Sequence, residues 1–245
     1  YGGRLAGPVR VDPARHDVGE LGDEPMLLAA FAPVFVARDR AAGVRLAEAS
    51  GARAILMDDG FQNPAVAPDL SLVVIDAAEG FGNGRCIPAG PLREPVATGL
   101  ARADMTLAIG PPSPQAELLR AWGHLLTRPH LTGALVPLAT GMDWRGSRVL
   151  AFAGIGRPAR FFATLAAEGA AVLRSVALDD HQPLTEALMA RLAAEAASLG
   201  AQLVTTEKDA ARLPPAFRTR VLTLPVRLRI DDPGPLDRHL ERLGL

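Results

Sequence analysis

The sequence has 245 residues, of which 49% are hydrophobic and 22% charged, and its formal net charge is -1. This composition excludes a disordered or collagen-like chain, and the length suits one large or two modest domains. The small net charge argues against nucleic acid as a partner, because binding to many phosphates requires an excess of Lys and Arg. A single cysteine, Cys86, excludes an internal disulfide and a thiolate zinc cluster, and it fits a reducing compartment. No apolar run is long enough for a membrane-spanning helix.

Apolar runs alternate with helical patterns in the first half of the chain, which predicts a mostly parallel sheet covered by helices. The segments predicted to be extended are residues 8–11, 33–37, 53–57, 70–76 and 105–110. The segments predicted to be helical are residues 25–30, 39–50 and 111–124. Residues 80–95 are rich in glycine and proline, which indicates a functional or a disordered loop.

Two acids stand at the start of the first predicted helix. Pro25 fits the first helical turn, so Asp23 and Glu24 lie at the helix N-terminus. One interpretation is that they only cap the helix and complement its dipole. The other is that they belong to a functional site.

A second pair of acids follows residues 53–57. This apolar run lies between Gly51 and Gly60 and predicts a buried strand that ends at Asp58 and Asp59. Ligands of open α/β sheets bind beyond the carboxyl ends of the strands, where two carboxylates can hold Mg²⁺. The alternative is that they are turn acids beside a glycine.

The second half of the chain repeats the alternation of strands and helices. The segments predicted to be extended are residues 131–138, 148–154, 171–176, 202–205 and 221–224. The segments predicted to be helical are residues 158–168, 184–199 and 232–243. We expect the first two extended segments to pair as a connector between domains. Thr206 and Asp209 resemble the capping box of a short helix.

These patterns predict an α/β protein with two α/β layers joined by the connector. The expected N-terminal domain covers residues 1–130, the two-stranded linker region residues 131–147, and a smaller C-terminal α/β domain residues 148–245. Because the sequence starts without an initiator Met, inside a glycine-rich loop, we expect that its natural N-terminus is missing.

Acids and arginines occur together at predicted loops and helix starts. The acids are Asp23, Glu24, Asp58, Asp59 and Glu94. The arginines are Arg4, Arg10, Arg38, Arg40, Arg85 and Arg93. Carboxylates that hold a metal and guanidinium groups that bind phosphate oxygens are what phosphoryl transfer requires. His181 follows Asp180 at a predicted strand end, where it is either a structural residue or a catalytic one.

A series of motifs runs in order along the chain. They are Tyr1-Gly2-Gly3-Arg4, Gly22-Asp23-Glu24-Pro25, Met57-Asp58-Asp59-Gly60-Phe61-Gln62-Asn63, Gly80-Phe81-Gly82-Asn83-Gly84, Gly90-Pro91-Leu92-Arg93-Glu94-Pro95, Asp180-His181 and Thr205-Thr206-Glu207-Lys208-Asp209. Together they resemble the tetraacyldisaccharide 4'-kinase family. That family phosphorylates the 4'-hydroxyl of the lipid A precursor, tetraacyldisaccharide 1-phosphate, with ATP and Mg²⁺.

The resemblance implies two α/β/α domains with mostly parallel sheets, a two-stranded linker, and an active site in the cleft between the domains. Asp23 would accept the proton of the sugar hydroxyl, assisted by His181. The acids that would hold the metal or lie near it are Asp58, Asp59, Glu24 and Glu94. The residues that would bind the acceptor or the nucleotide are Tyr1, Gly2, Gly3, Arg4, Gln62, Asn83 and Arg93.

Two features depart from the family pattern. The 245 residues contain no Walker-A pattern and no N-terminal membrane-anchoring segment, so the residues that bind the ATP phosphates are unknown. Gln182 stands where the family often has a second histidine. The resemblance implies a monomer that meets the membrane through the missing segment, at the cytoplasmic face of the bacterial inner membrane. We expect the given chain alone to be soluble.

Two other functions stay open. The chain could be a non-catalytic remnant that binds nucleotide or lipid sugar, or a metal-dependent phosphohydrolase that uses the same acids. Transfer of labelled phosphate to the tetraacyl disaccharide favours the kinase, whereas release of phosphate without an acceptor favours the phosphohydrolase.

Overall fold

The computed structural model describes residues 3–180 and 182–245. Its contacts divide the chain into two compact units, each made of separate stretches of sequence. Unit 1 contains Tyr1–Ser50 and Pro137–Val226, and unit 2 contains Gly51–Val136 and Arg227–Leu245. The domain boundaries expected from the sequence remain a prediction.

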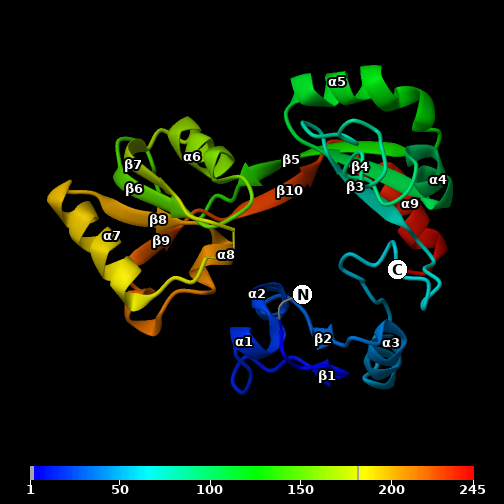
Figure 1. Ribbon diagram of the computed structural model, residues 1–245, viewed down its shortest axis with the longest axis horizontal. Coiled ribbons are helices and arrows are strands. Elements are labelled where there is room, and N and C mark those ends of the chain that lie inside the picture. The colour runs from blue at the N-terminus through cyan, green and yellow to red at the C-terminus, as the bar shows by residue number, and fades with distance from the viewer. Residues whose placement is uncertain (1–2, 181) are drawn as a thin grey trace. The chain divides into compact units, whose positions relative to one another are not determined.

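The larger sheet of unit 1 has four parallel strands in the order β7-β6-β8-β9 (Figure 1). Its elements are β6 (Arg148–Ala153), α6 (Pro158–Ala167), β7 (Ala171–Ala177), α7 (Glu186–Ser198), β8 (Gln202–Thr205), α8 (Glu207–Ala210), the 3₁₀ helix η2 (Pro215–Phe217) and β9 (Val221–Thr223). Alternate residues of β6 pack against different helices, because successive side chains of a strand point to opposite faces. Phe152 packs with Met189 of α7, and Ala151 packs with Leu165 of α6. This part of unit 1 is therefore an α/β/α sandwich.

The N-terminal part of unit 1 contains two short strands and three helices. They are β1 (Val9–Arg10), α1 (Val18–Leu21), α2 (Asp23–Leu28), β2 (Phe35–Val36) and α3 (Arg40–Ala49), and the two strands pair antiparallel. Asp17 and Glu20 form a capping box at the start of α1. Gly22, between α1 and α2, has a φ of 94°, which favours glycine. The chain can therefore end one helix and begin the next at Asp23.

Unit 2 has a sheet in the order β10-β5-β4-β3, in which β3, β4 and β5 are parallel. Its elements are β3 (Leu72–Asp76), α4 (Val96–Arg102), β4 (Met105–Ile109), α5 (Pro112–Trp122), the 3₁₀ helix η1 (Gly123–Leu125), β5 (His130–Pro137), β10 (Val226–Ile230) and α9 (Gly234–Arg242). On β4, Ala108 packs with Leu118 of α5, and Leu107 packs with Leu236 of α9. Helices again cover both faces of the sheet.

The expected strand over residues 53–57 is wrong. These residues form bends and irregular chain, Ile55 is 38% exposed and Leu56 is 97% exposed. A strand requires a neighbour that accepts and donates its backbone hydrogen bonds. Within the described residues no strand pairs with this run, so its apolar pattern is not sufficient to make it one.

The expected pairing of the connector is also wrong. The strand over residues 131–138 is present as β5, but it lies between β10 and β4, and β6 belongs to the sheet of unit 1. The chain passes between the units after Ser50, Val136 and Val226. The last two of these points fall in β5 and β10. The two strands that connect the units are therefore β5 and β10, and β10 was not predicted from the sequence.

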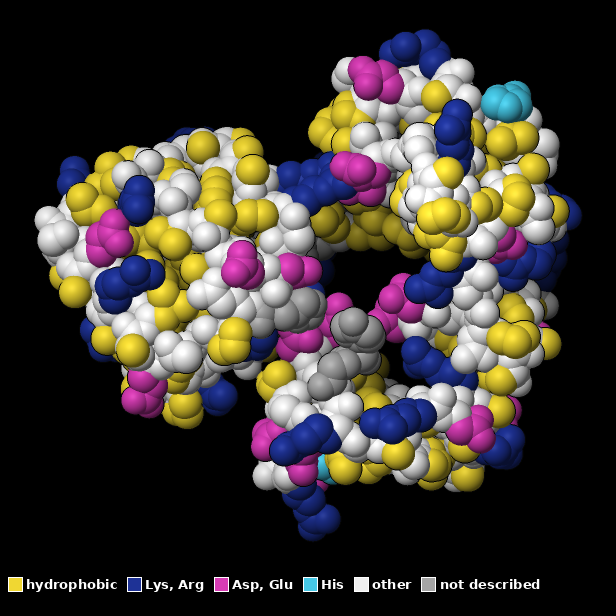
Figure 2. All heavy atoms as spheres, viewed as in Figure 1, with side chains coloured by type: hydrophobic (Ala, Val, Ile, Leu, Met, Phe, Trp, Pro, Cys, Tyr) yellow, Lys and Arg dark blue, Asp and Glu magenta, His cyan; other side chains and the backbone are white. Residues whose placement is uncertain are grey.

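The other expected helices and strands are present within a few residues of their predicted ends, and the α/β fold class is confirmed. On the face seen in Figure 2, Lys and Arg side chains alternate with Asp and Glu, with hydrophobic side chains between them. This mixture agrees with the net charge of -1. Among the described helices, none is long and apolar enough to cross a membrane.

Candidate active site

Asp23 begins α2 and is almost completely buried, with 8% of its surface exposed. Its Oδ1 atom accepts a hydrogen bond of 3.1 Å from the backbone N–H of Glu24. Pro25 lies in the first turn, as predicted, where its missing N–H has no cost. The Asp23 carboxylate is therefore held at the start of α2 by this backbone hydrogen bond and by the side chain that packs against it.

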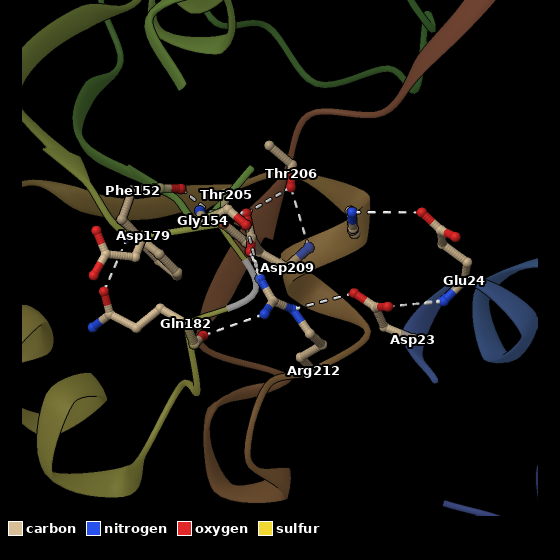
Figure 3. A network of polar contacts seen from close by, with 11 residues as sticks. Asp23, Glu24, Phe152, Gly154, Asp179, Gln182, Thr205, Thr206, Asp209 and Arg212 are labelled. Atoms are coloured by element: carbon tan, nitrogen blue, oxygen red, sulfur yellow. Dashed lines mark hydrogen bonds and ion pairs between the residues drawn. The ribbon is translucent and has the colours of Figure 1, made fainter. Parts of the chain in front are cut away.

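Arg212 of the same unit packs against Asp23. The Nε atom of Arg212 lies 3.9 Å from Oδ2 of Asp23, and both side chains are at least nine-tenths buried. Figure 3 shows Asp23, Arg212 and Asp209 pointing toward one another from α2 and from the end of α8. The Nε atom has no hydrogen-bond partner within the part of the chain that the structure describes. The guanidinium therefore faces the carboxylate as an ion pair.

Asp209 holds Arg212 in place. It has no exposed surface, and its carboxylate forms an ion pair with Nη2 of Arg212. Its Oδ2 atom accepts hydrogen bonds from the backbone N–H of Gly154 at 3.0 Å and from Oγ1 of Thr206 at 2.8 Å. Of the predicted capping box only the N-cap half is present: Thr206 accepts a hydrogen bond from the N–H of Asp209 at the start of α8, whereas the Asp209 carboxylate bonds Gly154, the Thr206 hydroxyl and Arg212. The Asp209 side chain also anchors the guanidinium, which the sequence analysis did not foresee.

Gly154 connects this cluster to the end of β6. Its backbone oxygen accepts a hydrogen bond of 3.1 Å from Arg212, and a Cβ at this position would lie 3.1 Å from the backbone oxygen of Asp179. A side chain here would be tight, because the Asp179 backbone would have to move by about a few tenths of an ångström to admit it. The backbone N–H of Gly154 donates its hydrogen bond to the Asp209 carboxylate.

Gln182 and Asp179 also belong to this cluster. His181 itself lies outside the described residues. Gln182, the next residue, accepts a hydrogen bond of 3.2 Å from Arg212 through its backbone oxygen. Its side chain accepts a hydrogen bond of 3.0 Å from the N–H of Asp179. Arg212 thus contacts both Asp23 and Gln182.

Glu24 lies beside the first turn of α8. Its Oε1 atom is 3.6 Å from Nζ of Lys208, in a half-exposed ion pair. The Thr205 to Asp209 motif therefore meets Asp23 through Arg212 and Glu24 through Lys208.

In unit 2, Gln62 and Glu94 are brought together. Nε2 of Gln62 donates a hydrogen bond of 2.7 Å to Oε1 of Glu94, and the same oxygen forms an ion pair with Arg102. The guanidinium of Arg102 also lies 4.5 Å from the centroid of the Phe61 ring. Glu94 is therefore held by a cation, and Arg102 fixes the turn that carries Gln62.

Asp58 and Asp59 lie exposed on that turn, and Asp59 has a φ of 50°, which Asp adopts more readily than most residues. Two adjacent carboxylates fit Mg²⁺, which takes one or two carboxylates and completes its shell with water and phosphate oxygens. Within the described residues, no group of three or more His, Cys, Asp or Glu side chains could hold a metal by itself. The donor set fits a metal shared with a phosphate ligand.

Asn83 and Arg93 lie in the glycine-rich loop of unit 2. The Asn83 side chain donates a hydrogen bond of 2.9 Å to the backbone oxygen of Ala89 and accepts one of 3.1 Å from the N–H of Arg85. It therefore shapes the loop. Arg93 is exposed.

The first motif is described only in part, because Tyr1 and Gly2 lie outside the described residues. Gly3 packs on α1, where a Cβ would lie 2.5 Å from the backbone oxygen of Glu20. A larger residue at position 3 would clash with α1, so packing alone accounts for Gly3. Arg4 is exposed.

Comparison with known proteins gives the family. The sequence profile described as Tetraacyldisaccharide-1-P 4'-kinase matches residues 1–244. The tetraacyldisaccharide 4'-kinase of Dinoroseobacter shibae is 63% identical over 244 residues, which cover 99% of this chain and 72% of the relative. That of Jannaschia sp. is 56% identical over 243 residues, covering 99% of this chain and 74% of the relative.

A solved structure supports the fold. LpxK from Aquifex aeolicus, described as an apo form in complex with ATP, matches with a TM-score of 0.73 and 21% identity. The match covers 99% of this chain and 76% of that one. The α/β fold and the relatives together define a kinase. The chain belongs to the tetraacyldisaccharide-1-P 4'-kinase family.

Proposed function

We propose that this protein transfers the γ-phosphoryl group of ATP to the 4'-hydroxyl of tetraacyldisaccharide 1-phosphate, the lipid A precursor. The observation that carries the proposal is the family match over residues 1–244. The arrangement around Asp23 adds chemical support, because a buried carboxylate fixed by an ion pair is suited to meet one substrate hydroxyl.

In this proposal Asp23 accepts the proton of the sugar hydroxyl. A general base must lie within hydrogen-bond distance of that proton, and its orientation decides how efficiently it works. Arg212 holds the carboxylate of Asp23 from one side. His181 is proposed to assist, and its neighbour Gln182 is bound by the same guanidinium.

Asp58 and Asp59 are proposed to hold Mg²⁺ together with the phosphates of ATP. A bound Mg²⁺ would neutralise charge that develops on the transferred group. Gln62, Asn83, Arg93 and the loop from Tyr1 to Arg4 are proposed to bind acceptor or nucleotide. Glu24 and Glu94 are both paired with cations, so we assign them to the surroundings of the metal and phosphates.

The acceptor is a lipid, and this places the reaction at a membrane surface. We propose the cytoplasmic face of the bacterial inner membrane, where ATP is available. The support for this location is the chemistry of the two substrates.

The test is transfer of labelled phosphate from ATP to tetraacyldisaccharide 1-phosphate by the full encoded protein. We expect a labelled product that depends on the acceptor, and an Asp23→Asn variant that turns over about 10²–10⁴-fold more slowly, the usual contribution of a positioned base. Glu241→Gln, on the exposed face of α9, serves as the control with normal turnover. Phosphate release without an acceptor would instead indicate a phosphohydrolase, and normal turnover of Asp23→Asn would remove Asp23 from its role.

A further inference from the structure

Arg102, the last residue of α4, contacts the turn that follows Asp58 and Asp59. Its Nη1 atom donates a hydrogen bond of 3.3 Å to the backbone oxygen of Phe61, and its guanidinium lies 4.5 Å from the centroid of the Phe61 ring. Arg102 thus holds Phe61 through both the main chain and the side chain. The proposed reaction assigns no role to Arg102.

A second connection between Arg102 and the turn runs through Glu94. Oε1 of Glu94 forms an ion pair with Nη2 of Arg102 and accepts a hydrogen bond of 2.7 Å from Nε2 of Gln62. Hydrogen bonds to an ionised group are stronger than those between neutral groups, and the Glu94 side chain is only 24% exposed. Arg102 therefore holds Phe61 directly and Gln62 through a carboxylate.

The two residues that Arg102 holds are the central residues of a hydrogen-bonded turn. The N–H of Asn63 donates a hydrogen bond of 3.0 Å to the backbone oxygen of Gly60, which closes the turn over residues 60–63. The pair of carboxylates proposed to hold Mg²⁺ comes immediately before this turn. Because the pair and the turn are adjacent in the chain, the orientation of the two carboxylates depends on how firmly the turn is fixed.

The sequence of α4 agrees with this arrangement. Gly99 lies inside the helix, where glycine is less favourable than alanine. A Cβ at this position would lie 3.3 Å from Oε1 of Glu94, so the carboxylate would have to move by about a few tenths of an ångström. The glycine therefore leaves room for Glu94 to lie against α4 while it contacts Arg102 and Gln62.

We propose that Arg102 is a positioning residue for the metal site: by holding the turn over residues 60–63, directly and through Glu94, it keeps the carboxylates of Asp58 and Asp59 in the orientation that binds a divalent cation. The inference rests on the proposed function, which assigns Mg²⁺ to these two acids. Mg²⁺ requires near-ideal octahedral geometry, so a small change in the direction of its carboxylate ligands weakens its binding.

The first test measures metal binding without turnover. Mn²⁺ is added to the full encoded protein with a non-hydrolysable ATP analogue, and free Mn²⁺ is measured by electron paramagnetic resonance, with the analogue alone as background. We expect Arg102→Met to raise the dissociation constant of Mn²⁺ about tenfold, which is a common effect of removing a group that orients metal ligands. Arg102→Lys should recover part of the affinity, because lysine keeps the charge beside Glu94 but lacks the planar fork of arginine.

Arg120→Met is the matched control for this measurement. Arg120 is an exposed arginine on α5 in the same unit, and its Nη2 atom lies 4.0 Å from Oε1 of Glu117. The same substitution thus removes a guanidinium from another helix and another ion pair. It should leave the dissociation constant of Mn²⁺ unchanged.

Gly99→Ala separates positioning from stability. Alanine favours the helix, so a purely structural role of α4 predicts normal or tighter binding of Mn²⁺. The positioning role predicts weaker binding, because the added Cβ displaces the Glu94 carboxylate. Hydrogen exchange checks the fold of the Arg102→Met variant: exchange should become faster in residues 58–63 and stay slow in β4. If β4 remains protected, Arg102→Met decides the question, and if it does not, Gly99→Ala decides it.

The kinase assay completes the test. Arg102→Met should raise the Mg²⁺ concentration that gives half-maximal rate about tenfold and leave KM for the acceptor unchanged. Normal binding of Mn²⁺ by the deciding variant, or no binding by the unmodified protein beyond that of the analogue, would overturn the inference. If the unmodified protein still transfers phosphate in that case, the proposed function stands. If no phosphate is transferred but Mn²⁺ binding depends on Arg102, the proposed function fails and the positioning role of Arg102 stands.

Discussion

Asp209 accepts hydrogen bonds from Gly154 and Thr206 and pairs with Arg212, although it has no exposed surface. A buried carboxylate is tolerated because each of these groups compensates the hydration that it has lost. Removal of one of these groups should therefore lower the free energy of unfolding.

We predict that Asp209→Ala lowers the free energy of unfolding by about 3–5 kcal/mol, because the buried guanidinium of Arg212 then has lost its closest partner. Urea unfolding followed by circular dichroism measures this change. Glu241→Ala, at an exposed position, should stay within about 0.5 kcal/mol of the unmodified protein. A loss below about 1 kcal/mol for Asp209→Ala would contradict the compensation described here.

Arg212 should affect catalysis through the position of Asp23. We predict that Arg212→Met lowers kcat about 10–100-fold and leaves KM for ATP unchanged, since misorientation of a base by about 1 Å has effects of this size. Arg212→Lys should recover part of the loss because it restores the charge near the carboxylate. Steady-state kinetics of the three proteins tests this. Equal activity of the Met and Lys variants would limit Arg212 to a structural role.

Among the elements, β5 carries a histidine that links stability to pH. Nδ1 of His130 lies 2.8 Å from Oγ1 of Thr106, and its buried Nε2 has no hydrogen-bond partner among the residues that the structure describes. Burial lowers the pKa of His130 from its usual value of 6.5, because the charged ring would lose its hydration.

The sign of the pH effect follows from this shift. Between the lowered pKa and 6.5, the unfolded chain binds a proton at His130 that the folded chain does not bind. The folded state is therefore fully stabilised by this effect when the pH is above the pKa of His130 in the unfolded chain. Its stability falls as the pH drops below that pKa. We predict that the urea midpoint decreases from about pH 7.5 to about pH 5.5, and that His130→Gln shows a smaller decrease. The same slope in both proteins would exclude His130 as its source.

The elements also show how far sequence reasoning reaches. Most helices and strands could be predicted, because periodicity and capping are local signals. Residues 53–57 could not, since their apolar pattern says nothing about whether a neighbouring strand is present. β10 was missed although its sequence, Val-Arg-Leu-Arg-Ile, alternates in the manner of a strand.

For the candidate site, sequence motifs found the acids but not the residue that holds them. Asp23, Glu24 and the Thr205 to Asp209 motif were selected from the sequence, and the structure brings them together. Arg212 was missed because its partners Asp209, Gln182 and Gly154 lie 3, 30 and 58 residues away along the chain, and Asp23 lies farther still, at no regular spacing. The three-dimensional fold alone relates these positions.

At the scale of the whole molecule, the last residues belong to unit 2, although the sequence analysis expected them in a C-terminal domain. β10 is an outer strand of the unit 2 sheet, and Leu236 of α9 packs against the core that contains Leu107.

We predict that deletion of residues 227–245 increases backbone hydrogen exchange in β4 and β5 and leaves β6 and β8 protected, because β10 pairs with β5 and α9 packs on β4, and all of these elements belong mainly to unit 2. Hydrogen exchange measured by mass spectrometry distinguishes the two sheets. Increased exchange in β6 and β8 with unchanged β4 would instead support the boundaries expected from the sequence.

The interleaved chain also affects how the protein is synthesised. Residues 1–50 leave the ribosome before the rest of their unit, because the other stretch of that unit starts at Pro137 and ends at Val226. At about 5–20 residues per second, translation of the intervening stretch takes on the order of ten seconds. During that time α2 lacks its native neighbour α8, so we expect chaperone binding at this stage to affect the yield of folded enzyme.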